Sequence, residues 1–330
     1  MTPTPLYLPD EIEDAMQRGA ALSVSISGGK DSQALAIELA KLHLRRQWPG
    51  PIFALHMDLG RAEWAHTPHH VEKIARENNL DLIVVRRPQG DLVQEIQDRM
   101  ETLRGTNKPF WPSSAQRYCT SDQKRGQADK VYRNLGDHLP PFWPSSTSRY
   151  CISHQKTNQA DKVYRQHDLV ISVEGIRADE SPARRKKNPI HVRKQITAKR
   201  YQDLTVAEAL HQHTPGQRVA INWFPLFEWD VNAVWNTQET TQADLDHRRE
   251  LYRRGDVENA LDGWPFHPAY VFGNERLSCA ICMLASNSDI RNGARHNPEL
   301  YAIYRQMERD GGSTLKQGKP LEEIVNQAIA

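Results

Sequence analysis

The sequence has 330 residues, of which 38% are hydrophobic, so it is long enough for one large domain or two ordinary ones around a buried core. Its 43 basic and 41 acidic residues leave a formal net charge of +2, which excludes a general attraction to nucleic acid or to anionic membranes. No apolar run reaches about 18 residues, which excludes a hydrophobic membrane-spanning helix, and the Pro- and acid-bearing first residues do not resemble a secretion signal, so we expect a cytoplasmic protein without a membrane partner.

The first part of the sequence alternates short apolar runs with segments of helical periodicity. Leu35, Leu39 and Leu42, for example, fall on one face of a helix. The pattern predicts strands at 20–26, 51–57, 80–85 and 168–174, and helices at 31–45, 67–77 and 90–103. Strands separated by helices of this length are typical of parallel sheets with right-handed crossovers. We therefore predict an α/β fold with a doubly wound, mostly parallel sheet.

The first strand runs into the hexapeptide Ser27-Gly28-Gly29-Lys30-Asp31-Ser32 at the start of the first helix. Two glycines allow a sharp turn and a close approach to a ligand, and the N–H groups and dipole of a helix start attract an anion. The serines add hydroxyl donors, Lys30 adds a positive charge, and Asp31 fits either a water-mediated contact to Mg²⁺ or a helix cap. The Walker pattern and the dinucleotide fingerprint do not fit this segment. The hexapeptide predicts a phosphate-binding turn, the alternative being an ordinary glycine-rich turn.

The middle of the sequence contains an internal repeat. PFWPSSAQRYCTSDQKRGQADKVYR occupies residues 109–133, and PFWPSSTSRYCISHQKTNQADKVYR occupies residues 141–165. Two copies are too few to close the core of a solenoid, so we interpret them as a tandem duplication. Each copy is expected to form a loop bearing Pro and Trp, then Arg-Tyr-Cys, then a polar helix.

The second half of the sequence changes in composition. Residues 184–200 carry eight Lys or Arg and no acid, which predicts either a solvated loop or a contact for a polyanion such as nucleic acid. Residues 1–215 are predicted to form the nucleotide-binding α/β domain. Residues 216–330 are predicted to form an extension on the same core, with helical runs at 231–254 and 298–309.

The four cysteines are Cys119, Cys151, Cys279 and Cys282. In a cytoplasmic protein such a set favours metal binding or catalysis over disulfides. The CxxC of Cys279 and Cys282 fits half a zinc site, a redox pair or part of an iron–sulfur site. With Cys119 and Cys151 the sequence offers four thiolates, enough for a four-iron cluster or, less favoured, a structural zinc. Inert buried thiols are the alternative.

Several segments together resemble one family. The hexapeptide after the first strand resembles the signature of the PP-loop ATP pyrophosphatases, which have the adenine nucleotide alpha hydrolase fold. Five further segments resemble, in the same order, landmarks of the phosphoadenylyl-sulfate reductase-like branch: HMDLGRAEW (56–64), RYCTSDQK (117–124), EGIRADESPARR (174–185), FPLFEWDVNAVW (224–235) and ERLSCAIC (275–282). The similarity covers roughly residues 20–310.

In such folds the ligand binds beyond the carboxyl ends of the strands. Asp58 is therefore expected to border the adenine or ribose, unless it caps a turn, and Gly175 lies at the end of the fourth strand. Arg177 and Arg184 are expected to bind phosphate or sulfate oxygens, unless they form a surface ion-pair cluster. In the first repeat copy CTSDQK matches the branch better than CISHQK does in the second, which favours Cys119 over Cys151. A cluster held by three cysteines with one open iron is a further reading.

The resemblance implies a nucleotide-dependent enzyme. Reductases of this branch attack sulfur with a cysteine near the C-terminus, and no cysteine follows Cys282 in this sequence. We therefore expect cleavage of ATP with Mg²⁺ to AMP and pyrophosphate, adenylation of a substrate, and sulfur transfer to nucleic acid or a small molecule, with a sulfur-donor protein as partner. Lys30, Asp31, Arg177, Arg184 and Cys119 are the expected catalytic residues. The alternatives are reduction of adenylyl sulfate or phosphoadenylyl sulfate, and a non-catalytic nucleotide-binding subunit of a nucleic-acid modification system.

Overall fold

A single six-stranded sheet forms the centre of the protein. The computed structural model describes residues 4–106, 108–133, 135 and 168–327. The strands follow the order β3-β2-β1-β4-β6-β5 across the sheet. They are β1 (Ala21–Ser25), β2 (Ile52–Met57), β3 (Asp81–Val85), β4 (Leu169–Val173), β5 (Ile190–Val192) and β6 (Val219–Trp223). Every neighbouring pair is parallel except β5 and β6, which confirms the predicted mostly parallel sheet.

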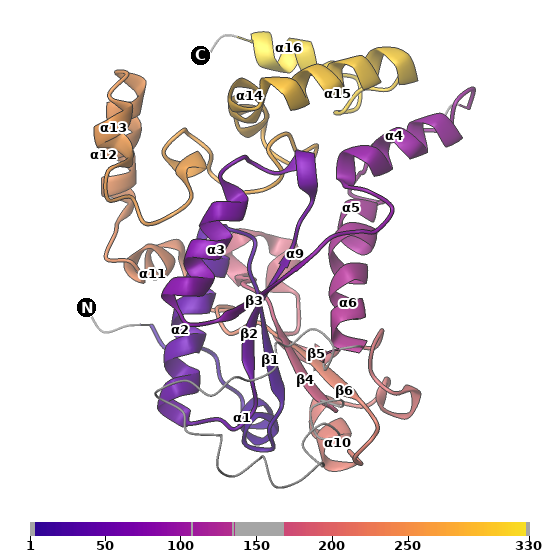
Figure 1. Cartoon of the computed structure of the whole chain (residues 1–330), viewed down its shortest axis with the longest axis vertical. Coiled ribbons are helices and arrows are strands. Elements are labelled where there is room, and N and C mark those ends of the chain that lie inside the picture. The colour runs from indigo at the N-terminus through magenta and orange to yellow at the C-terminus, as the bar shows by residue number, and fades with distance from the viewer. Residues whose placement is uncertain (1–3, 107, 134, 136–167, 328–330) are drawn as a thin grey trace, which may run out of the picture.

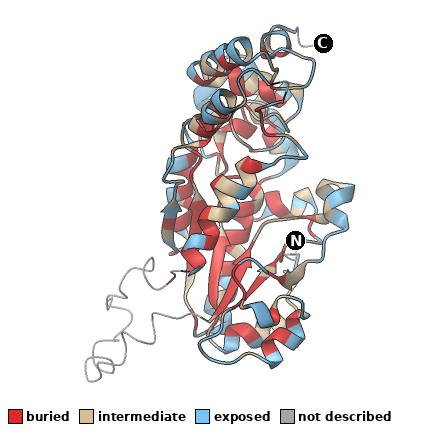
Figure 2. Cartoon of the chain, turned by 90° about the vertical axis from the view of Figure 1, so that its right-hand side faces the viewer, coloured by how far each residue is buried: buried red, intermediate tan, exposed pale blue. Residues whose placement is uncertain are grey.

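Helices cover both faces of the sheet, as a doubly wound fold requires. Side chains alternate between the faces along each strand. Leu22 and Val24 of β1 pack into the core shared with α2 (Lys30–Arg46), whereas Ala21 packs into the core on the other face, with Val131 of α6 (Gly126–Arg133). The central strands β1, β4 and β6 are buried along most of their length, as the red strands in Figure 2 show.

The remaining helices lie around the sheet and beyond one end of it. Figure 1 shows α14, α15 and α16 gathered at one end of the molecule, far from α1 and α10 at the other end of the sheet. The helices not yet placed are α1 (Asp10–Gln17), α3 (Thr67–Glu77), α4 (Leu92–Thr102), α5 (Tyr118–Thr120), α9 (Pro182–Arg185), α10 (Val206–His211), α11 (Val231–Asn236), α12 (Gln242–Arg253), α13 (Val257–Leu261), α14 (Asn287–His296), α15 (Pro298–Gly311) and α16 (Leu321–Asn326). The short 3-10 helices are η1 (Gly60–Ala62), η3 (Ala178–Glu180), η4 (Lys199–Tyr201) and η5 (Pro268–Tyr270). Among the described residues, no helix is both long and apolar enough to cross a membrane.

Two strands were missing from the sequence-based prediction. β6 lies between β4 and β5, and β5 occupies part of the basic segment 184–200. The apolar run of β6 spans only five residues within a region rich in Trp and Pro, and β5 spans three residues flanked by charged side chains. The sheet therefore continues past residue 215, where the sequence was expected to leave the α/β domain.

The helical run predicted at 231–254 is two helices. α11 ends at Asn236, and α12 begins at Gln242. Glu239 between them has a φ of 54°, a left-handed conformation that interrupts a helix. The side chain of Thr241 accepts a hydrogen bond from the Asp244 N–H and so caps the second helix.

The first repeat copy forms the structure expected of it. A loop leads into a continuous helical run made of α5, a π-helical segment at Ser121–Arg125 and α6. Cys119 lies two residues before the π-helical segment, a distortion often found at functional sites. The second copy, with Cys151, lies outside the described residues.

Candidate functional site

The turn between β1 and α2 places two glycines at the start of the helix. Gly28 has a φ of 78°, which favours glycine at this point. Gly29 is the N-cap of α2 and has no side chain of its own to cap the helix. The partial positive charge of the helix start is therefore not neutralised by an acidic side chain at the N-cap.

Hydrogen bonds hold the turn in shape from within. The Ser32 hydroxyl donates to the Gly29 carbonyl oxygen at 2.9 Å, and it accepts a hydrogen bond from the Ser27 N–H at 3.1 Å. The Lys30 N–H donates to the hydroxyl of Tyr270 at 3.0 Å. The serines thus shape the turn, and a tyrosine from the C-terminal part of the chain, which the sequence did not point to, contacts it directly.

A buried chain of charges links the turn to the segment after β4. The Lys30 ammonium lies 2.7 Å from one oxygen of Asp31, and the Arg177 guanidinium lies 2.6 Å from the other. Arg177 also reaches Asp179 at 2.7 Å. Burial alone would raise the pKa of Asp31, but Lys30 and Arg177 outweigh it and lower that pKa. The Asp31 carboxylate holds both cations in fixed positions beside the N-terminus of α2.

Gly175 brings β4 close to the same helix end. A Cβ at this position would lie 3.0 Å from the carbonyl oxygen of Asp31 and 3.3 Å from the N–H nitrogen of Ser32. Because the strand order reverses between β1 and β4, both segments flank the crevice where such folds bind ligands. The glycine allows the close approach of the two backbones.

Three further arginines surround this point. Arg184 forms an ion pair with Glu180, and Arg276 donates to the backbone oxygen of Glu180 at 2.9 Å. Burial lowers the pKa of Arg184, and the nearby positive charges of Arg276, Arg177 and Arg117 lower it further. The cations therefore gather in excess of the carboxylates, as a polyanion site requires. Arg117 and Arg276 were not predicted as site residues, although both stand in the segments that carry the cysteines.

Three of the cysteines lie together. The thiol of Cys279 donates a hydrogen bond to Cys282, which raises the pKa of Cys279 and lowers that of Cys282 to about 6. Burial raises the pKa of Cys119, and the charge of Cys282 raises it further. Lys124 lies close enough to lower the pKa of all three thiols.

The cysteine segment packs directly on the phosphate turn. The Leu277 side chain lies 3.6 Å from the positions that a Cβ would take at Gly28 and at Gly29. Arg117, which adjoins the thiol of Cys119, is also one of the charges around Arg184. The structure thus places the thiols and the cationic crevice side by side.

The spacing of the thiols bears on the group they fit. Within the described residues, the sulfurs of Cys119, Cys279 and Cys282 do not all lie within 4.8 Å of one another. Zinc with Zn–S bonds of 2.3 Å needs sulfurs roughly 3.8 Å apart. In this arrangement the three thiols therefore do not all reach one zinc ion, and soft thiols also suit an iron–sulfur group.

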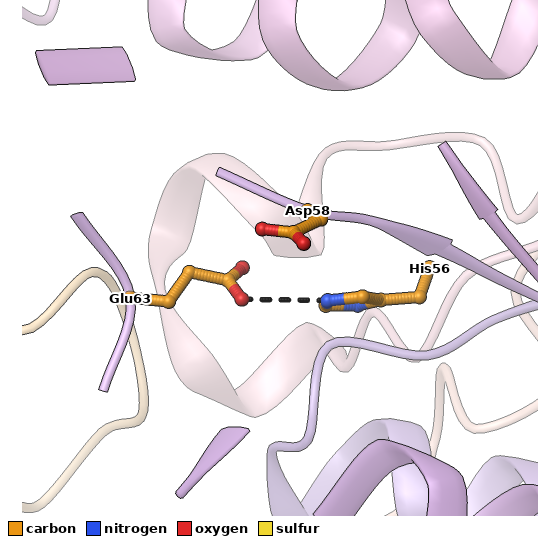
Figure 3. Close-up of side chains that lie close together, drawn as sticks. All are labelled: His56, Asp58 and Glu63. Carbon is orange, nitrogen blue, oxygen red and sulfur yellow. Dashed lines mark ion pairs between the residues drawn. The ribbon is translucent and has the colours of Figure 1, made fainter. Parts of the chain in front are cut away.

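Asp58 lies at the carboxyl end of β2, as expected. One of its oxygens accepts a hydrogen bond from the Gly60 N–H at 2.6 Å, and the other accepts one from Arg86 at 2.6 Å. His56 and Glu63 lie beside it, and Figure 3 shows the three side chains converging. Asp58 therefore has both a turn-capping contact and an ion pair in this structure.

The sheet is doubly wound, and a glycine turn joins β1 to α2 beside a buried lysine and arginine. Together these features define an α/β protein of the PP-loop type. The sequence model of the phosphoadenosine phosphosulfate reductase domain matches residues 21–282, and the chain belongs to this family. A comparison with curated proteins found no match to the chain. Family membership points to a small-molecule nucleotide as ligand and to an enzyme of the sulfonucleotide-reductase or PP-loop type.

Proposed function

We propose that the chain is a PP-loop enzyme that cleaves ATP to AMP and pyrophosphate, adenylates a substrate oxygen, and serves sulfur transfer to a nucleic acid or a small molecule. The observation that carries this proposal is the pairing of a glycine turn at the start of α2 with a cluster of buried cations. A chain of several phosphates fits such a site better than a single small anion does, because the cations extend from Lys30 to Arg184.

The proposed reaction is a displacement at the α-phosphorus of ATP. The substrate oxygen forms a bond to this phosphorus, the bond to the bridging oxygen breaks, and pyrophosphate leaves with the bonding electron pair. The N–H groups of the helix start and Lys30 would hold the departing pyrophosphate, and Arg177 and Arg184 would balance the charge that develops. A sulfur or nitrogen nucleophile then displaces AMP from the adenylate.

Asp31 fits a water-mediated contact with Mg²⁺, because its carboxylate stays partly exposed while it pairs with Lys30 and Arg177. Bound Mg²⁺ would neutralise phosphate charge. The aspartate itself fixes the two cations and keeps them aimed at the crevice. This positioning role holds whichever nucleotide is bound.

The thiols beside the crevice support a role in sulfur chemistry. Cys119, Cys279 and Cys282 fit an iron–sulfur cluster by their softness, and such a cluster would supply or carry sulfur in the proposed transfer. Cys119 stands nearest to the cationic residues in sequence, two positions after Arg117. We propose it as the cysteine that faces the nucleotide.

Reduction of adenylyl sulfate or phosphoadenylyl sulfate is the second candidate, and the family match favours it. The same arginines would then hold sulfate and phosphate groups. A third candidate, a nucleotide-binding subunit of a nucleic-acid modification system, draws on the exposed Arg185, Lys186 and Lys187. Other members of the basic segment serve the fold, because Arg193 is buried against Asp129 and Lys194 pairs with Asp203.

Calorimetric titration separates these candidates. The anaerobically purified chain is titrated in parallel with ATP and Mg²⁺, adenylyl sulfate and phosphoadenylyl sulfate, and pyrophosphate exchange into ATP is then measured with candidate acceptors. Tighter binding of ATP together with exchange would support adenylation. Preference for a sulfonucleotide would overturn it in favour of reduction, and ATP binding without turnover under any acceptor would favour the accessory subunit. Iron in the purified protein tests the cluster separately, and zinc alone or no metal would contradict it.

A further inference from the structure

Three ligand-type side chains meet behind the phosphate turn, and the proposed reaction uses none of them as a group. His56 is the penultimate residue of β2, and Asp58 and Glu63 follow the strand on either side of η1. Their ligand atoms all lie within 4.8 Å of one another, and they form the one such group among the described residues. Figure 3 shows the imidazole and both carboxylates pointing to a common centre.

The hydrogen bond on the far side of His56 fixes its tautomer. Nδ1 lies 2.9 Å from the carbonyl oxygen of Ile26, which only accepts, so Nδ1 carries a hydrogen. Nε2 is then left with a lone pair unless it is protonated. It lies 3.3 Å from an oxygen of Glu63, and both atoms are buried without a hydrogen-bond partner. A lone pair facing a carboxylate in a buried site requires a positive charge between or on these groups.

The geometry fits a metal ion as that positive charge. Two ligands bound to one ion at about 2.1 Å stand about 3.0–3.4 Å apart, which matches the separation of Nε2 from the Glu63 oxygen. The hydrogen bonds that orient these ligands from outside the site are also typical of a metal site. A backbone oxygen orients His56, and the Gly60 N–H and Arg86 orient Asp58.

We propose that His56, Asp58 and Glu63 bind one divalent cation of the manganese, iron or zinc class. One imidazole nitrogen and two carboxylates suit these ions, and a dication would supply the positive charge between His56 and Glu63. Arg86, whose side chain is 74% exposed, pairs with Asp58 on the outer side of the site. Because His56 is tied to Ile26, one residue before Ser27, the ion would hold the entrance to the phosphate turn.

The competing occupant is a proton on His56. Burial lowers the pKa of His56, but the facing carboxylate of Glu63 outweighs burial and raises it. A protonated imidazole would satisfy Glu63 without any metal. The experiment therefore has to separate an ion pair from a metal site.

Manganese is the probe for the test, since it prefers oxygen and nitrogen ligands and binds weakly to the cysteines. The full chain, without nucleotide, is titrated with Mn²⁺ and the free ion is followed by electron paramagnetic resonance. We expect one tightly bound Mn²⁺ per chain, bound at least tenfold more weakly by Glu63→Gln and His56→Gln. The matched control, Glu72→Gln, removes an exposed carboxylate on the nearby α3 and should bind Mn²⁺ like the unmodified chain.

A second readout needs no variant and covers the case in which His56→Gln does not fold. In the unmodified chain, Mn²⁺ well below one equivalent should broaden the imidazole resonances of His56 before those of the exposed His69. Binding that is unchanged in a folded Glu63→Gln variant would overturn the proposal. So would the absence of Mn²⁺ binding, or a His56 imidazole that stays protonated at both nitrogens under excess Mn²⁺.

Discussion

Replacing Gly29 by aspartate tests the phosphate turn with little change to the fold. A Cβ at Gly29 meets no heavy atom closer than 3.5 Å, and its φ is not in the left-handed region, so a side chain fits. Gly29 is also the N-cap of α2, where an aspartate accepts hydrogen bonds from the N–H groups of the first turn. The new carboxylate would therefore occupy the N–H groups that are proposed to hold phosphate.

The size of the effect follows from the charges. A carboxylate about 5 Å from a phosphate repels it by about 3 kcal/mol at an effective dielectric constant of about 20. This corresponds to a loss of affinity of roughly 100-fold, to which the blocked N–H groups add. The stability of the protein should change by only a few tenths of a kcal/mol, because glycine and aspartate are both accepted at an N-cap.

Calorimetry with ATP and Mg²⁺ measures the affinity, and urea unfolding measures the stability. Gly29→Ala is the steric control and should bind ATP nearly as well as the unmodified chain. Gly29→Asn is the control for charge, since its amide caps the helix without repelling phosphate, and it should fall between the two. ATP binding of normal affinity by a folded Gly29→Asp variant would show that the phosphate site lies elsewhere.

Three further predictions concern the residues around the turn. Arg177→Lys should weaken ATP binding about tenfold or more, because a lysine cannot bridge Asp31 and Asp179 together; calorimetry that finds equal affinity would contradict the role of the guanidinium. Gly175→Ala should lower the free energy of unfolding by about 1–3 kcal/mol, since its Cβ would press on the Asp31 carbonyl oxygen; urea unfolding measures the loss, and no loss would mean that the two backbones separate freely. Burial raises the pKa of Asp31, but Lys30 and Arg177 lower it more. The ionised carboxylate therefore stabilises the fold above about pH 4, and this contribution to the free energy of unfolding is lost as the pH falls through the lowered pKa. The stability difference between the unmodified chain and Asp31→Asn should therefore shrink on acidification, and a difference that is constant from about pH 7 to about pH 3 would refute this linkage.

The parts of the fold that the sequence predicted are those with strong local patterns. β1 to β4 and the helices after the first three strands have apolar runs or faces of the expected period. β5 and β6 lacked such a signal. Val219–Trp223 is short and set among aromatic residues, and Ile190–Val192 takes its strand form from pairing with β6 rather than from its own sequence.

Some residues of the candidate site could likewise be predicted from local sequence, whereas others could not. The glycine turn was visible in the sequence because a single local segment carries it. Arg177 was visible because it follows β4 directly. The contact of Tyr270 with the Lys30 N–H, and the approach of Arg276 to Glu180, depend on how distant parts of the chain pack, and no local pattern encodes them. His56 and Glu63 were also missed, since their convergence depends on the 3-10 turn between them.

The packing of Leu277 on Gly28 and Gly29 has a thermodynamic consequence. The cysteine segment and the nucleotide turn share one contact surface, so a ligand that stabilises either segment in this arrangement also changes the affinity of the other. Binding equilibria coupled in this way are reciprocal. If a group bound by the cysteines raises the affinity for nucleotide by some factor, bound nucleotide raises the affinity of the cysteines for that group by the same factor. Nucleotide added during purification would then protect whatever group the thiols carry.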